Sequence, residues 1–481
     1  MLSILKHKVV QGTMWYTLAG LLTSGMSVIL LPVMTRWMTP SEFGILNAAM
    51  SLSLLIMPIV TLGLGASVVR FYHDYDVGSD QFARFFSSSF WCQCVSVAFV
   101  CLAILTPFWL GMIDSISGVD LQHLYPVLVL VALNPPRDIG NQLLTSQEKH
   151  GKASINQLVA FAIATSLSLW LIGALEMGAL GRLYGRAGGA VVAAIMLIKL
   201  SEFRENFRMR IDLNELKKSL GYGIPYVPYS FALAAMLTAD KLLLQYYSDL
   251  EEVGIYSAAK TVAMGMSFIF VAVTRAWYPR YFKLRNANDD RSVIDGQWAL
   301  MCLLSLTVVG FCILIPVVYP LMVDKPYWRG IAVMPVLAMG IYGYGLFLTQ
   351  ANYISYLKKT ILLPIIAGVG VLVNLICAML WMPIYGMTGA AWAILVGYGV
   401  MNLVLVGLSF KLERRALERV VLPVFGCALA AGGVCVVMLI PSTWGWIPRV
   451  CIAVIAVLVF AALWYSGKKL LEQRCLVSSV C

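Results

Sequence analysis

The sequence predicts an all-α integral membrane protein with two similar six-helix lobes, and three observations support this. First, 60% of the 481 residues are hydrophobic and only 12% are charged, against about 45–50% and about 25% in soluble domains. Second, the apolar residues form long runs, and about 20 of them cross a bilayer as a helix. Third, two segments 210 residues apart have nearly the same sequence.

This repeat relates residues 41–49, which read SEFGILNAA, to residues 251–259, which read EEVGIYSAA. Further landmarks recur at a similar offset: Gly178 and Gly181 reappear as Gly386 and Gly389, and a basic turn at residues 148–149 reappears at residues 358–359. Six apolar runs separate each landmark from its copy. Because an even number of spans preserves direction, the lobes should be parallel repeats about an axis along the membrane normal.

Fourteen apolar runs are long enough to span the membrane. They are 13–34, 45–67, 85–110, 124–146, 155–175, 184–200, 220–244, 255–277, 298–320, 331–357, 361–381, 389–410, 420–440 and 449–466. The first run is too long for a cleaved signal and is interpreted as a retained helix. We expect an N-terminal lobe over 1–210, a C-terminal lobe over 211–419, and two extra helices with a cytoplasmic tail over 420–481.

The basic residues predict the orientation. With the N-terminus in the cytoplasm, 25 of the 35 lysines and arginines fall on the cytoplasmic side, so both termini should be cytoplasmic. Arg182 and Arg186, at the start of the sixth span, are counted among the basic residues of the outer side. Because the basic residues sit in short loops, the net charge of +11 does not indicate a nucleic-acid partner. The longest cytoplasmic connection, 201–219, is equally consistent with an amphipathic surface helix and a solvated linker.

Three motifs resemble those of one family. Residues 31–44, LPVMTRWMTPSEFG, resemble the helix 1–2 signature of Wzx-type polysaccharide-biosynthesis flippases of the multidrug/oligosaccharidyl-lipid/polysaccharide (MOP) exporter superfamily. Residues 240–244, DKLLL, followed by 254–260, GIYSAAK, resemble that family's helix 7–8 region, and Trp277 with Pro279 resembles the end of its helix 8.

The resemblance implies two six-helix lobes around a central cavity, with two additional helices. It also implies that an undecaprenyl-pyrophosphate-linked oligosaccharide moves across the bacterial inner membrane by alternating access, for surface polysaccharide such as O-antigen. The partners would be this lipid-linked substrate, membrane lipids, a coupling ion (proton or sodium) and polysaccharide-assembly proteins such as a polymerase.

The first span is uncharged, which is a departure from two relatives. The peptidoglycan-precursor flippases of the superfamily carry charges in this helix, and its drug and cation antiporters typically use a carboxylate near it. The uncharged span disfavours a peptidoglycan precursor and also weakens the antiporter interpretation, which stays the alternative to a flippase. A membrane glycosyltransferase or polymerase would need large acidic outer loops, but these loops are short, so we expect no enzyme.

Charged side chains within the spans are the best candidates for substrate binding, because charge in a bilayer is costly unless it is paired or hydrated. Four cations exceed two carboxylates, which suits a pyrophosphate. Together with polar neighbours and two tyrosines, the candidate residues are Asn134, Arg137, Asp138, Asn141, Tyr226, Asp240, Lys241, Lys260, Arg275 and Tyr353.

Each candidate also has a structural alternative. Arg137, the first choice, shares a helix face with Asn134 and Asn141, but it could instead pair with Asp138. Lys260 could pair with Asp240, which could itself be a coupling-ion site, and Arg275 could extend to the headgroups. Tyr226 and Tyr353 could contact sugar or serve in packing and the interfacial belt. The four histidines are far apart, and no metal or cofactor is expected.

Overall fold

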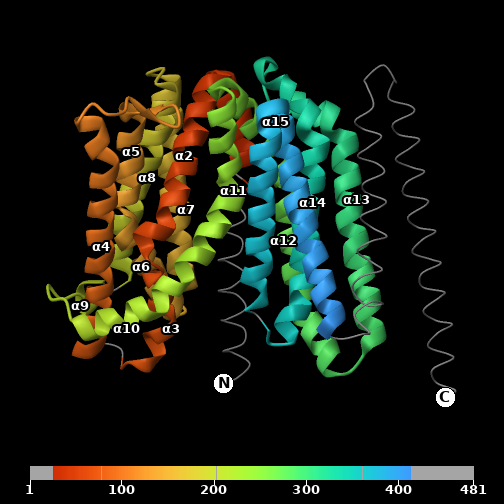
Figure 1. The fold of residues 1–481 in the computed structure, drawn as a ribbon. Coiled ribbons are helices and arrows are strands. Elements are labelled where there is room, and N and C mark those ends of the chain that lie inside the picture. The colour runs from red at the N-terminus through yellow and green to blue at the C-terminus, as the bar shows by residue number, and fades with distance from the viewer. Residues whose placement is uncertain (1–24, 26, 77–78, 202, 360, 413–481) are drawn as a thin grey trace. The chain divides into compact units, whose positions relative to one another are not determined.

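The computed structural model describes residue 25 and residues 27–76, 79–201, 203–359 and 361–412. Within these residues, nine helical segments are long and apolar enough to cross a membrane. The chain divides into two compact units, and the division falls between Ser257 and Ala258, inside one long helix, α12 (Figure 1).

The N-terminal unit begins, among the described residues, with a short apolar helix over Ser27–Trp37. Its further elements are α2 (Pro40–Thr61), α3 (Leu64–Phe71), η1 (Tyr72–Asp74), α4 (Asp80–Trp109), β1 (Ser115–Ile116), β2 (Val119–Asp120), α5 (Leu121–Ala132), α6 (Asn134–Ser146), α7 (His150–Gly173), α8 (Gly178–Leu200), α9 (Phe203–Asn206), α10 (Leu213–Gly223), η2 (Ile224–Tyr226), α11 (Val227–Tyr247) and the first turns of α12 (Leu250–Asn286). The two strands form an antiparallel hairpin in which Ser115 lies opposite Asp120.

The C-terminal unit contains the rest of α12, then α13 (Asp290–Met322), η3 (Lys325–Val333), α14 (Met334–Tyr356) and α15 (Leu362–Leu412). The last of these is two helices joined at a kink, where Gly386 adopts a φ of 52°. The kink separates the two spans that were expected over 361–381 and 389–410. The expected spans over 420–440 and 449–466 lie outside the described residues, as does most of the span over 13–34.

Two expected spans are broken helices. The second bends between α2 and α3, where Leu62 and Gly63 both have positive φ. The fourth is interrupted at Leu133, between α5 and α6, because Pro135 and Pro136 follow directly and a proline fits only the first turn of a helix. Both breaks lie in the N-terminal unit.

The sixth span was predicted to begin too late. Helix α8 begins at Gly178 rather than at residue 184, so both Arg182 and Arg186 lie within a membrane helix, although the charge pattern counted them on the outer side. The reason is close packing on α7: a side chain at Gly185 would overlap Ser168, and one at Gly189 would overlap Ala164. The four cations counted within the predicted spans therefore did not include those of α8.

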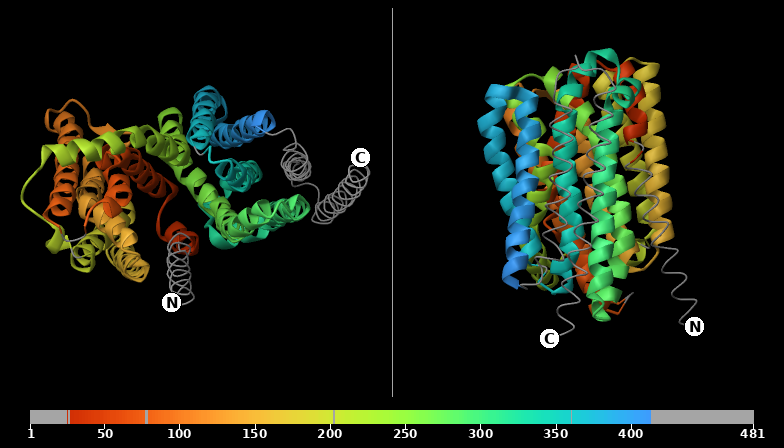
Figure 2. Two further views of the ribbon diagram at one scale, coloured as in Figure 1. Left: turned by 90° about the horizontal axis from the view of Figure 1, so that it is seen from below. Right: turned by 90° about the vertical axis from the view of Figure 1, so that its right-hand side faces the viewer.

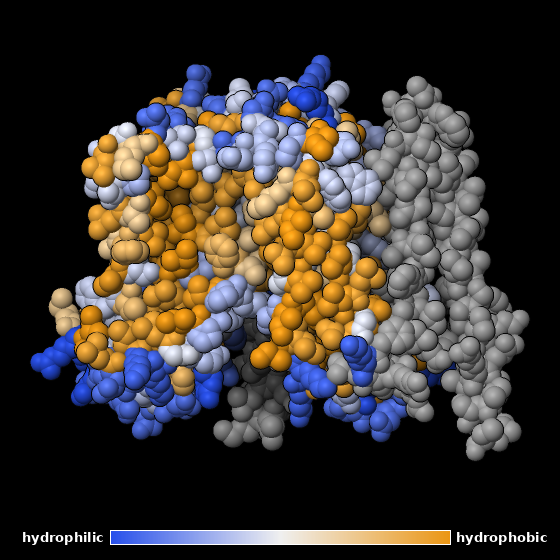
Figure 3. Space-filling view, viewed as in Figure 1, coloured by the Kyte–Doolittle hydropathy of each residue, from blue (hydrophilic) through white to orange (hydrophobic). Residues whose placement is uncertain are grey.

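The surface of the N-terminal unit has the banding of a membrane protein. Figure 3 shows an apolar zone over its helices, with hydrophilic side chains gathered above and below. Seen from below in Figure 2, α10 lies across helices that are viewed nearly end-on, and it packs against α3 and α4. The chain is a multi-pass membrane protein. The lobe boundary expected at residue 210, defined by the repeat rather than by packing, stays a prediction.

Candidate substrate-binding site

The break between α5 and α6 positions Arg137 and Asp138. Helix α6 starts at Asn134, so Arg137 lies in its first turn and Asp138 directly after it. The Asn134 Nδ2 atom is buried and has no hydrogen-bond partner among the described residues. Asn141 is exposed one to two turns further along α6. The structure therefore keeps this predicted set on one short helix and places Arg137 at the helix end.

Asp138 is held by neighbouring helices. Its carboxylate accepts a hydrogen bond from Gln93 Nε2 of α4 at 2.9 Å, and Gln93 also donates to the Thr61 carbonyl at the end of α2, at 3.3 Å. A side chain at Gly65, in the first turn of α3, would overlap the carboxylate. Asp138 also interacts electrostatically with the adjacent Arg137. We interpret Asp138 as a positioning residue that joins three helices behind Arg137.

Arg137 belongs to a cluster of arginines that the sequence did not reveal. The charge of Arg186 on α8 is close enough to repel that of Arg137 on α6, and Arg182 is similarly close to Arg186. Arg182 donates to Ser168 Oγ of α7 at 3.1 Å. The side chain of Arg186 is solvent-accessible although protein atoms surround it closely. The three arginines are thus successive neighbours, and Arg137 also lies beside Asp138, whose carboxylate is already hydrogen-bonded.

Sequence reasoning missed Arg182 and Arg186 because they were counted with the outer side and not among the charges within the spans. A usable signal was present: the two residues are four positions apart, which places them on one face of a helix. Glycines surround them in the sequence, and glycines permit close approach of a neighbouring helix. Only the packing of α8 against α6 brings this face to Arg137.

The charges of the seventh span are engaged in helix packing. Asp240 is 2% exposed and accepts a hydrogen bond from the hydroxyl of Tyr256, in the first turns of α12, at 2.6 Å. Lys241 Nζ donates to Asn47 Oδ1 of α2 at 3.1 Å. These contacts join α11 to α2 and to the start of α12. A role for either residue in binding substrate or a coupling ion stays a prediction.

The remaining predicted residues are divided between the two units. In the C-terminal unit, Lys260 is buried, whereas Arg275 is exposed and interacts electrostatically with Tyr344 of α14. Tyr353 is 3% exposed in an apolar cluster with Ile354 and Met401, which indicates a packing role. In the N-terminal unit, Tyr226 is exposed and its ring lies 5.4 Å from that of Tyr229. Among the residues that the structure describes, no group of three or more histidine, cysteine or acidic side chains could hold a metal ion.

A bundle of long apolar helices with cations gathered inside one unit defines a multi-pass membrane transporter. The chain belongs to the polysaccharide biosynthesis protein family, which residues 9–285 match. A Shigella flexneri protein described as "Putative O-antigen transporter" is 22% identical over 411 residues, covering 81% of this chain and 95% of that protein.

Solved transporter structures have a similar fold. The inward closed conformation of the lipid II flippase MurJ is similar with a TM-score of 0.68 at 14% identity, over 95% of this chain and 98% of that one. An inward-facing multidrug resistance MATE family transporter of the MOP superfamily has a TM-score of 0.59 at 14% identity, over 85% and 95% of the two chains. At this identity the similarity shows the fold alone.

Proposed function

We propose that this protein is a flippase that moves an undecaprenyl-pyrophosphate-linked oligosaccharide repeat unit across the bacterial inner membrane for surface polysaccharide assembly. Transport would run from the cytoplasmic to the outer leaflet by alternating access, with both chain termini in the cytoplasm. The observation that carries this proposal is the cluster of Arg137, Arg182 and Arg186 in the N-terminal unit. Membership of the family and the description of the Shigella relative support it.

The chemistry of the cluster suits a pyrophosphate. Like charges gathered among membrane helices repel one another more strongly than in bulk water, so the arrangement favours an anionic ligand that relieves the repulsion. A guanidinium presents several N–H donors in a planar fork that matches phosphate oxygens. Asp138 would hold Arg137 in place through the shared helix turn while its own carboxylate bonds to Gln93. No covalent step is needed, because the lipid tail can stay in the bilayer while the headgroup is neutralised.

Net transport in one direction requires a source of free energy, which removal of the product on the outer side or an ion gradient can supply. A proton or sodium ion is the coupling ion we propose, and a polymerase on the outer side would consume the product. The alternative, a drug or cation antiporter, would require a site with net negative charge. The cluster around Arg137 has the opposite sign, which favours an anionic cargo.

The test is complementation of a strain that lacks this gene, with surface polysaccharide as the readout. Arg137→Ala and Arg186→Ala should each lower surface polysaccharide ~10- to 100-fold, since a hydrogen bond to a charged group contributes about 1.5–3 kcal/mol. Arg186→Lys should retain more activity than Arg186→Ala, because lysine keeps the positive charge and loses only the planar set of guanidinium N–H donors. The matched control is Arg70→Ala, because Arg70 is an exposed arginine paired with Asp74 at 3.4 Å.

Membrane levels of each variant must equal those of the wild type for the comparison to hold. Normal polysaccharide in both alanine variants would show that the arginine cluster does not bind the substrate. Normal polysaccharide in the strain without the gene would overturn the flippase assignment itself.

A further inference from the structure

The connection between α8 and α11, residues 201–226, is fastened to α4 by three consecutive serines. The backbone N–H of Arg208 donates to Ser87 Oγ at 2.7 Å, and that of Asp212 donates to Ser88 Oγ at 2.8 Å. Ser89 Oγ lies 2.9 Å from the hydroxyl of Ser219. All three serines of α4 are fully buried. Residues 208 and 212 are therefore two fixed points between which the backbone crosses α4.

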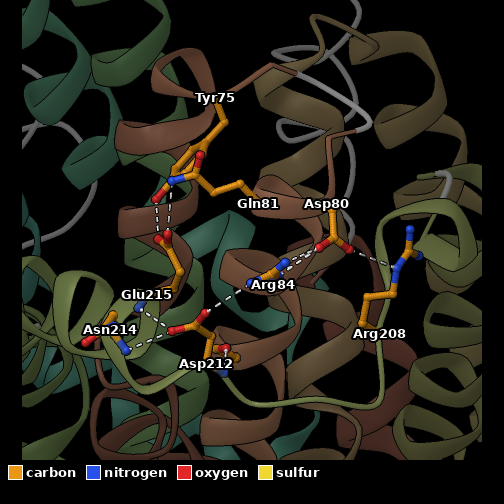
Figure 4. A network of polar contacts seen from close by, with 9 residues as sticks. Tyr75, Asp80, Gln81, Arg84, Arg208, Asp212, Asn214 and Glu215 are labelled. Carbon is orange, nitrogen blue, oxygen red and sulfur yellow. Dashed lines mark hydrogen bonds and ion pairs between the residues drawn. The ribbon is translucent and has the colours of Figure 1, made fainter.

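Charged groups reinforce this attachment (Figure 4). Arg84 of α4 contacts Asp80 at 2.5 Å and Asp212 at 3.9 Å, and Arg208 reaches Asp80 at 3.8 Å. Further along the connection, the hydroxyl of Tyr75 donates to Glu215 of α10 at 2.5 Å. Burial, and then the hydrogen bond to Glu215, raise the pKa of Tyr75, so its hydroxyl stays protonated and remains a donor at physiological pH. Arg208 and Asp212 of the connection thus face α4, and Glu215 faces Tyr75.

Three apolar side chains of the same stretch are exposed. Met209 is 83% exposed, Ile211 51% and Leu213 76%. The chain between Phe207 and Asp212 has no regular secondary structure, and Met209 lies in a bend. The hydrogen bonds at residues 208 and 212 hold the backbone on either side of Met209 and Ile211. The three apolar side chains form an apolar row on a fixed strap, which we define as residues 207–213.

The surroundings of the strap match the boundary between lipid tails and headgroups. Arg210 and Lys217 are exposed cations beside the apolar row. The strap begins among aromatic side chains, where the ring of Phe207 lies 5.9 Å from that of Trp91. In Figure 3 the α9–α10 region lies at the lower left, where the apolar zone meets the hydrophilic lower rim. Apolar side chains with adjacent cations are the pattern of a segment lying in the membrane interface.

We propose that the strap is an interfacial anchor that binds the phospholipid surface on its side of the membrane. Met209, Ile211 and Leu213 enter the boundary of the acyl chains, and Arg210 and Lys217 bind headgroup phosphates. The anchor and the serine attachment together hold the connection at one depth in the membrane and in one register on α4. This inference does not depend on the cargo of the transporter.

The test places a dansyl amino acid at position 209 of the full-length protein in vesicles of phosphatidylethanolamine and phosphatidylglycerol. Lipids brominated on their acyl chains should reduce the emission at least ~2-fold, because the quencher must approach the fluorophore within the bilayer, while aqueous iodide should have little effect. A matched probe at Asp114, an exposed residue of the loop between α4 and β1, should show the opposite pattern. Quenching at position 209 by iodide and not by brominated lipid would overturn the proposal, and would direct attention to a protein partner.

The headgroup contacts have a separate test. Arg210→Glu combined with Lys217→Glu should lower bromolipid quenching at position 209 at least ~2-fold, because the acidic side chains are repelled from phosphate. The control is Lys199→Glu, which changes an exposed lysine at the end of α8. Unchanged quenching in the double variant would show that Arg210 and Lys217 do not bind headgroup phosphates. A probe at Ile211 provides a second readout if the label at 209 perturbs folding.

Discussion

The two copies of the repeated segment begin alike and pack against each other. Thr39 Oγ1 accepts a hydrogen bond from the N–H of Glu42 at 3.3 Å, and Asp249 Oδ1 accepts one from the N–H of Glu252 at 2.7 Å. The crossing of α2 and the start of α12 is also reciprocal. A side chain at Gly44 would overlap the Leu250 carbonyl, and one at Gly254 would overlap the Pro40 carbonyl. The repeated glycine is therefore explained by a contact in which each copy packs on the other.

After this shared start the copies differ. Helix α2 ends after 22 residues at the bend formed by Leu62 and Gly63, whereas α12 continues for 37 residues. Val273 occupies the position that corresponds to Gly63, and a β-branched residue does not tolerate positive φ. The bend also receives α10, because a side chain at Gly63 would overlap the backbone of Gly223. Both copies thus keep the glycine at the crossing of α2 and α12. The bend at Leu62 and Gly63 occurs only in the first copy, where α10 packs.

Replacing Gly63 with the residue of the second copy is the strongest test of this difference. Gly63→Val should lower the free energy of unfolding by about 3 kcal/mol or more, because a strained φ and an overlap each cost about 1–3 kcal/mol. Thermal unfolding of the purified protein in detergent measures the loss. Gly310→Ala is the control, because no atom lies within 4 Å of a side chain added there, and its stability should be unchanged or slightly higher. A Gly63→Val protein as stable as the wild type would show that the bend does not require glycine.

The reciprocal crossing predicts matched effects of intermediate size. Gly44→Ala and Gly254→Ala should each destabilise the protein by about 1–3 kcal/mol through overpacking. Because both changes push the same two helices apart, the double variant should lose less than the sum of the single losses. The same thermal unfolding assay applies. A large effect of one substitution with none from the other would break the symmetry of the contact.

The helix caps should show the smallest effects. Thr39→Ala and Asp249→Ala should each cost about 1 kcal/mol, since each removes a side-chain acceptor at a helix start. Thr39→Ser and Asp249→Asn retain an acceptor and should recover most of the loss in the unfolding assay. Equal stability of the alanine and cap-retaining variants would indicate that the caps do not stabilise these helices.

Much of the architecture was predictable, because the signals are local or periodic. Apolar run length is set by bilayer thickness, so the long described helices overlap the runs of about 20 apolar residues that predicted membrane spans. Family membership could be predicted from the motifs at residues 31–44 and 240–260. Arg137 and Asp138 stood out as charges within a span. The bend at Gly63 and the early start of α8 were missed, because each depends on which neighbour packs closely there.

The sequence alone determined that the chain is an apolar, internally repeated helical membrane protein with charges in its spans, since composition and spacing encode the choice between lipid and water. Only the tertiary structure decided which of these groups meet. It places Arg186 of α8 near Arg137 of α6. It also forms the hydrogen bonds of Asp240 with Tyr256 and of Asp138 with Gln93. The two repeated glycines lie at the helix crossing where each copy packs on the other. Such pairings depend on the rotation and crossing of whole helices. Hydropathy does not specify either quantity, because a lipid-facing and a partner-facing side of a membrane helix can be equally apolar.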